Sequence, residues 1–159
     1  MAKFLLSLHV LAAVIAIGPV TVAASMFPRK ARAALADGPE AAGEAASVRT
    51  LYRITQVYAA LGVLVPVFGI GTAQVMGVMG SAWLITSLVL TVIAALVLLV
   101  LVLPRQEAVV ASLAGAADAD AAKALGGLKL LTMSTGLFSL LWAVVTVLMV
   151  VRPGSTTHA

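Results

Sequence analysis

The sequence predicts an all-α membrane protein in which four transmembrane helices form an up-and-down bundle. Hydrophobic residues fill 62% of its 159 positions and charged residues only 10%, against about 50% and about 25% in an ordinary soluble domain. Four long stretches contain no charged residue, and the positive charges gather in two of the segments that connect them. We therefore treat residues 1–159 as a single integral membrane domain.

The four uncharged stretches cover residues 4–27, 54–79, 83–103 and 130–151. A helix rises about 1.5 Å per residue, so that about 20 residues cross the hydrocarbon core of a bilayer, which is roughly 30 Å thick. The stretches are continuously apolar, whereas the strands of a membrane barrel alternate between apolar and polar residues. We therefore expect helices. A second reason is that a helix satisfies its backbone hydrogen bonds within its own segment.

The first stretch has two readings. Lys3 and a small-residue site before Ser25 would suit a signal peptide, but the apolar run is longer than the 7–15 residues that are typical of such a peptide. We therefore expect a membrane helix, with a kink at the Gly18-Pro19 pair.

The second helix is expected to begin well before the membrane, inside the connection 28–53. Asp37-Gly38-Pro39-Glu40 has the composition of a helix start, with proline near the first helical position and acids in the first turn. The third helix is expected to bend or end at Pro104, because proline lacks the amide hydrogen and clashes with the preceding turn.

The second long connection, 104–129, is expected to contain a short interfacial helix over 106–114. Asp118 and Asp120 then lie near the start of a segment that leads into the fourth helix through Gly126-Gly127.

The lysines and arginines predict the orientation. Eight of the ten lie in the two long connections, and the other two are Lys3 and Arg152. The positive-inside rule places both connections in the cytoplasm and both termini outside. The net charge of +4 is thus explained by membrane orientation, and we expect no nucleic-acid partner.

The two halves of the chain show traces of a duplicated helical hairpin. Phe27-Pro28-Arg29 and Leu103-Pro104-Arg105 share a spacing of 76 residues, and the same spacing relates Glu44 to Asp120.

Small residues recur every three or four positions along the second stretch. This set consists of Gly62, Pro66, Gly69, Ala73 and Gly77. Such a face lets two backbones approach closely in lipid. It predicts packing inside the bundle, and the alternative is an interface with another protein or a mobile gate.

His9 is the one histidine inside a predicted span, and intramembrane histidines are functional candidates. One interpretation is structural, with the imidazole hydrogen-bonded to Gln74 at similar depth. The alternative is a soft metal site for Cu(I) formed by His9, Met76, Met79 and Met149, because imidazole and thioether groups are suitable ligands. A bis-histidine haem is not expected, because the second histidine is His158 in the tail.

Enzymatic machinery is missing from the sequence. It has no cysteine, no carboxylate inside a span and no recognisable catalytic or nucleotide-binding motif. We expect no enzyme and no cofactor, neither copper nor haem. The leading hypothesis is a non-catalytic structural or accessory component of a larger membrane assembly, in contact with the lipid bilayer and with a membrane-protein partner or a second copy. The alternative is a small transporter or metal-handling protein.

The segment Leu8-His9-Val10-Leu11-Ala12-Ala13, followed by Gly18-Pro19 on a four-span chain, resembles a family of uncharacterised bacterial predicted integral membrane proteins. It is also loosely similar to the membrane domain of copper-resistance D proteins. The first resemblance implies no activity, whereas the second would single out His9, although the other intramembrane histidines of a metal or haem domain are absent. Together with the alanine-rich composition, these resemblances imply a multi-pass protein of a bacterial cytoplasmic (inner) membrane.

Overall fold

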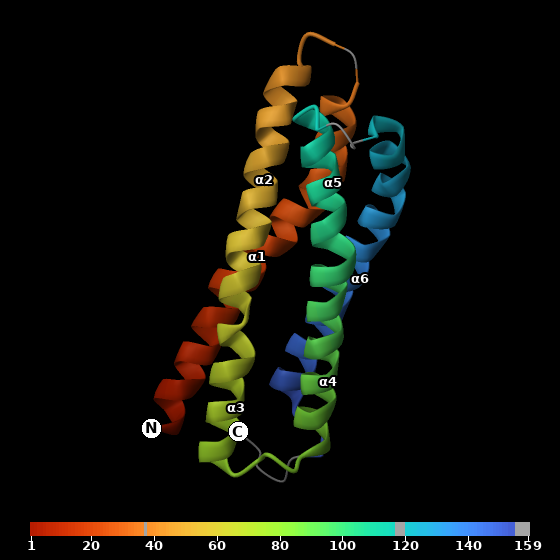
Figure 1. Cartoon of the computed structure of the whole chain (residues 1–159). Helices are drawn as coiled ribbons and strands as arrows, with labels where there is room; N and C mark the ends of the chain where they lie inside the picture. Colours follow the sequence, from red (N-terminus) through yellow and green to blue (C-terminus); the bar gives the residue numbers. More distant parts are fainter. Residues whose placement is uncertain (37, 117–119, 155–159) are drawn as a thin grey trace.

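The computed structural model describes residues 1–36, 38–116 and 120–154, and within these ranges every regular element is helical. Four helices are long and apolar enough to cross a membrane, covering Ala2–Ala34, Ala41–Met76, Ala82–Leu113 and Ala121–Val151. They run up and down in chain order, so that the first begins where the last ends (Figure 1). The predicted fold class is confirmed.

These four spans consist of seven elements. The first span is α1 (Ala2–Ala34), and the second span joins α2 (Ala41–Gly62) to α3 (Leu64–Met76). The third span contains α4 (Ala82–Leu96), the π-helical segment η1 (Val97–Val102) and α5 (Leu103–Leu113). The fourth span is α6 (Ala121–Val151). We call the end that holds the start of α1 and the end of α6 the terminal end. The opposite end, which holds the connections after α1 and after α5, is the basic end.

The second span begins at Ala41, well before the uncharged stretch, as the sequence predicted. Its N-cap is Glu40, and Asp37 lies outside the described residues. The fourth span begins after Asp120, whose carboxylate caps α6 by accepting hydrogen bonds from the backbone N–H groups of Ala122 and Lys123. Asp118 lies outside the described residues.

The second span is broken at Val63 because of Pro66. Proline has no amide hydrogen to donate, and its ring crowds the carbonyl four residues earlier, which here belongs to Gly62. Thus α2 ends at Gly62 and α3 begins at Leu64. By contrast, α1 continues unbroken through Pro19 and Pro28.

Of the two outcomes predicted for Pro104, a bend or an end of the third helix, the structure contradicts the end. Residues 106–114 do not form a separate interfacial helix, contrary to the sequence prediction. The helix continues through the proline to Leu113, with π-helical winding just before it. Four buried positions, Ala94, Leu98, Val102 and Gln106, follow one another in this stretch at intervals of four residues. In an α-helix each such interval would drift by about 40° around the axis. The wider π turn, with its i→i+5 bonding, keeps these positions on the buried face.

The hydrophobic core lies mainly toward the basic end. Its large side chains include Phe27, Val102, Leu128 and Phe138, which come from three of the four spans. Toward the terminal end the arrangement changes, because α3 packs chiefly on α1, and α4 packs chiefly on α6. The helices there form two pairs, and Figure 1 shows α3 and α4 joined by the connection at that end.

Candidate functional site: a cavity between two helix pairs

A cavity of about 680 Å³ lies toward the terminal end. Its walls come from α1 and α3 on one side and from α4 and α6 on the other, and they are mostly apolar. Polar groups are few, and the largest side chains that carry them are His9, Trp83, Trp142 and Arg152. A mostly apolar cavity of this size with a few polar groups is the usual form of a ligand or docking site.

His9 is held by the backbone of α3. Its Nδ1 lies 2.9 Å from the carbonyl oxygen of Val65. Because a carbonyl oxygen can only accept, Nδ1 carries the hydrogen and donates it, and in a neutral ring Nε2 is then left as an acceptor. The ring uses this carbonyl in place of the Gln74 amide that the sequence suggested. Gln74 itself is exposed.

Gly69 makes room for the imidazole of His9. A Cβ added at Gly69 would lie 2.9 Å from Cε1 and 3.2 Å from Nδ1 of that ring. Carbon atoms in van der Waals contact are about 3.5–4.0 Å apart, so any side chain at this position would displace the ring. The absence of a side chain at Gly69 is therefore tied to the position of His9.

The other small residues of the second span have different surroundings. A Cβ on Gly62 would lie 4.0 Å from Cδ1 of Ile17 on α1, and Ala73 is buried. Pro66 lines the cavity. Gly77 is the C-cap of α3 with a φ of 69°, a left-handed conformation that glycine adopts without steric cost. At Gly62 and Gly69 the small-residue face therefore meets α1 of the same chain.

Met76, Met79 and Met149 line the same cavity as His9. The structure thus brings the four residues of the sequence-based metal hypothesis to one place, with the two first methionines partly exposed. Within the described ranges no three His, Cys, Asp or Glu side chains are grouped to hold a metal ion. Any metal bound here would depend on thioether sulfur and one imidazole nitrogen, a donor set suited to Cu(I).

Arg152 and two tryptophans complete the cavity, and the sequence analysis did not select them. The guanidinium carbon of Arg152 lies 5.7 Å from the centre of the Trp83 ring, within the range of a cation–π contact. Trp142 packs edge-on against Phe138, and its buried Nε1 has no hydrogen-bond partner among the described residues. In the sequence, the position of Arg152 directly after the uncharged stretch 130–151 is the signal that could have selected it as a site residue.

Gln106 is a second polar group that the sequence analysis did not select as a site residue. Its side chain is 0% exposed, and both its amide atoms lack a hydrogen-bond partner among the described residues. Burial of Gln106 is unexpected from the sequence analysis, which places this residue in a helix at the membrane surface.

Neither a protein-family model, nor a curated protein, nor a solved structure matches the chain.

Proposed function

We propose that this chain is a non-catalytic integral membrane protein that acts as an accessory component of a larger membrane assembly. In this proposal it lies in a bacterial cytoplasmic membrane, with its basic end in the cytoplasm and its terminal end outside. The cavity between the helix pairs is the place where a transmembrane helix of the partner inserts. The observation that carries the proposal is this cavity, which four apolar spans leave between them at one end.

The length of the cavity along α1 and its lining favour a helix as the occupant. Its lining on α1 extends from Leu6 to Gly18, which corresponds to about 18 Å along a helix axis. Ala13 and Gly18 also line it, and a Cβ on Gly18 would meet nothing within 4 Å. Small residues along an open wall permit close approach of another backbone, which is how helices associate in lipid.

Site-specific photo-crosslinking in membranes tests this proposal. A photoreactive amino acid at Leu84 would lie in the cavity wall, whereas the same group at the exposed Val89 lies on α4 outside the lining. We expect Leu84 to yield a protein adduct of one defined mass and Val89 to yield lipid adducts. Lipid adducts alone at both positions would reject the partner helix. Mixing two differently tagged copies distinguishes a foreign partner from a second copy of this chain.

A second candidate function is metal handling, and a specific observation favours it. Among the described residues Nε2 of His9 has no hydrogen-bond partner, and the ring lines a cavity that three methionine side chains also line. Copper content of the purified protein, measured for His9→Gln and His9→Leu, separates the candidates. A glutamine can donate to Val65 as the imidazole does, but it is a poor ligand for a soft metal. Metal handling predicts copper in the wild type and its loss in both variants, while a structural histidine predicts no copper and a stable His9→Gln.

A further inference from the structure

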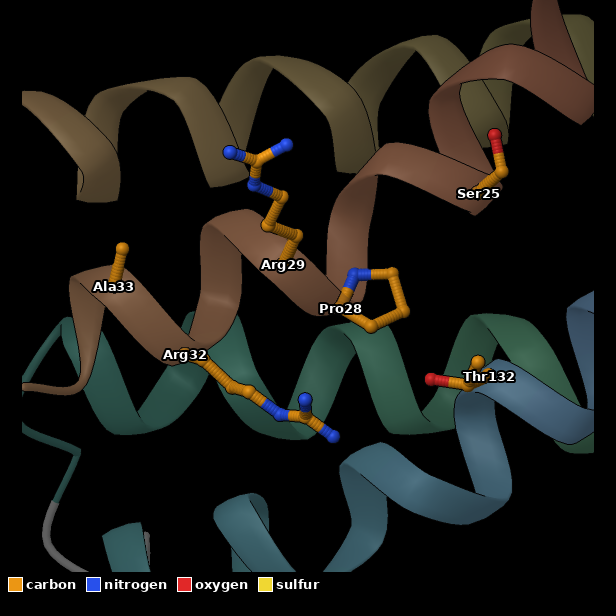
Figure 2. A pocket seen from close by; sticks show the side chains of 6 residues that line it. All are labelled: Ser25, Pro28, Arg29, Arg32, Ala33 and Thr132. Carbon is orange, nitrogen blue, oxygen red and sulfur yellow. The ribbon is translucent and has the colours of Figure 1, made fainter.

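A second depression, of about 550 Å³, lies between α1 and α6 toward the basic end. Its lining consists of Ser25, Pro28, Arg29, Arg32, Ala33 and Thr132. Figure 2 shows that Arg32 extends toward Thr132, while Arg29 lies on the other side of Pro28. Both arginines are exposed, and both line the depression.

The depression carries positive charge and no carboxylate. Lys30, between the two arginines, donates to Glu44 at 2.9 Å and is neutralised by it. Within the described ranges neither Arg29 nor Arg32 forms such an ion pair. The hydroxyl groups of Ser25 and Thr132 each donate to a carbonyl of their own helix at 2.9 Å. Each hydroxyl can turn its hydrogen toward an anion instead.

The depression also lies at a defined depth. Arg29 comes two residues after the uncharged stretch 4–27, where the hydrocarbon core gives way to lipid headgroups. On the membrane side of the depression, both helices expose apolar side chains. These are Val22 and Met26 on α1 and Met133 and Leu137 on α6, with exposed fractions between 45% and 62%. The depression therefore joins a positive site to two apolar surfaces that lipid chains can cover.

We propose that this depression binds the phosphate group of an anionic membrane lipid, with the acyl chains lying along α1 and α6. Guanidinium groups bind phosphate oxygens through paired hydrogen bonds, which are stronger than those between neutral groups. Basic pockets between membrane helices on the cytoplasmic side are suited to anionic headgroups. A soluble phosphate would use the same arginines but would gain nothing from the apolar surfaces.

Lipid titration of the purified full-length protein in neutral detergent, followed by native mass spectrometry, tests the proposal. The probes are phosphatidylglycerol, phosphatidylcholine with the same acyl chains, and glycerol 3-phosphate. We expect phosphatidylglycerol to bind about tenfold more tightly than phosphatidylcholine, and Arg29→Gln/Arg32→Gln to abolish this preference. Arg32→Gln alone should remove the larger share, because Arg32 points toward Thr132 (Figure 2).

The matched control is Arg49→Gln/Arg53→Gln, which removes the same charge from exposed positions of α2 outside the depression. This control should keep the preference to within about twofold. Equal loss in both double variants would overturn the site, because general attraction to the basic end would then explain binding. Binding of glycerol 3-phosphate as tight as that of phosphatidylglycerol would overturn the lipid as ligand. Retention of the preference in Arg29→Gln/Arg32→Gln would also overturn the proposal.

Discussion

The imidazole of His9 lies against the backbone of Gly69, so closely that a Cβ on Gly69 would be 2.9 Å from Cε1 of the ring. On its other side the ring donates from Nδ1 to the carbonyl of Val65. Both contacts involve α3, and together they determine where α1 and α3 meet near the terminal end. The histidine and the glycine therefore form one structural unit.

We expect Gly69→Ala to destabilise the protein by about 1–3 kcal/mol, the usual cost of overpacking. The added methyl group would move the ring of His9 and weaken its hydrogen bond to Val65. Unfolding in mixed micelles measures this cost. Gly71→Ala on the same helix is the control, because its Cβ meets nothing within 4 Å, and it should be neutral or stabilising by up to about 1 kcal/mol.

A double variant tests whether His9 is the cause of that cost. In His9→Ala/Gly69→Ala the methyl group has space, so the combined loss should be smaller than the sum of the single losses by at least about 0.5 kcal/mol. Strict additivity would show that Gly69 is required for a reason other than the ring.

Asp120 should stabilise α6 through its cap. Its Oδ1 accepts from the backbone nitrogens of Ala122 at 2.8 Å and Lys123 at 3.2 Å. Replacing such a cap by alanine usually costs about 1 kcal/mol, and we expect this loss for Asp120→Ala in the same unfolding measurement. Glu40 is the matched control, because it is the N-cap of α2 without a side-chain hydrogen bond. Equal losses at both positions would contradict a capping role.

Arg152 adopts a left-handed conformation, with a φ of 45° and a ψ of 58°. Glycine adopts this conformation without steric cost, whereas alanine, like arginine, adopts it only at a cost, so Arg152→Gly should be more stable than Arg152→Ala by about 1 kcal/mol. Both variants lose the contact with Trp83 equally, and their difference in unfolding free energy isolates the backbone term. A more stable alanine variant would show that the C-terminus of α6 rearranges.

The orientation is testable by single-cysteine labelling, because the sequence has no native cysteine. Ala42 and Gly80 are exposed positions near opposite ends of the second span. An impermeant maleimide added to intact cells should label Gly80→Cys at once and Ala42→Cys only after permeabilisation, as the positive-inside rule requires. The reverse pattern would invert the orientation, and the depression at Arg29 and Arg32 would then face outward.

The number and course of the helices could be predicted because a bilayer leaves few alternatives for long uncharged stretches. The lengths were less predictable, since the helices continue into the polar connections, where hydropathy no longer distinguishes helix from loop. Pro104 shows a related difficulty. Proline rules describe α-helical winding, and the π turn before it permits a continuous helix.

The partner of His9 could not be predicted, because it is a backbone atom whose position depends on how two helices slide against each other. His9 lies seven residues after the start of α1, and Gly69 lies seven before the end of α3. Gln74 lies only two residues before that end and is therefore closer to the surface than His9. Counting from the ends of the uncharged stretches placed Gln74 too deep. The shared position of His9 and the three methionines followed from depth alone, whereas Arg32 and Thr132 come to line one depression only through tertiary packing.

The π-helical segment Val97–Val102 also controls the rotational phase of everything beyond it. A π turn holds about one residue more than an α turn, so α-helical winding of the same residues would rotate α5 by about 100°. Gln106 and Val109 would then turn out of the core, and their exposed neighbours would turn in. Deletion of one residue in this segment would instead restore α-helical winding and keep α5 in its present rotational phase, so the π turn acts as a store for one residue of chain length.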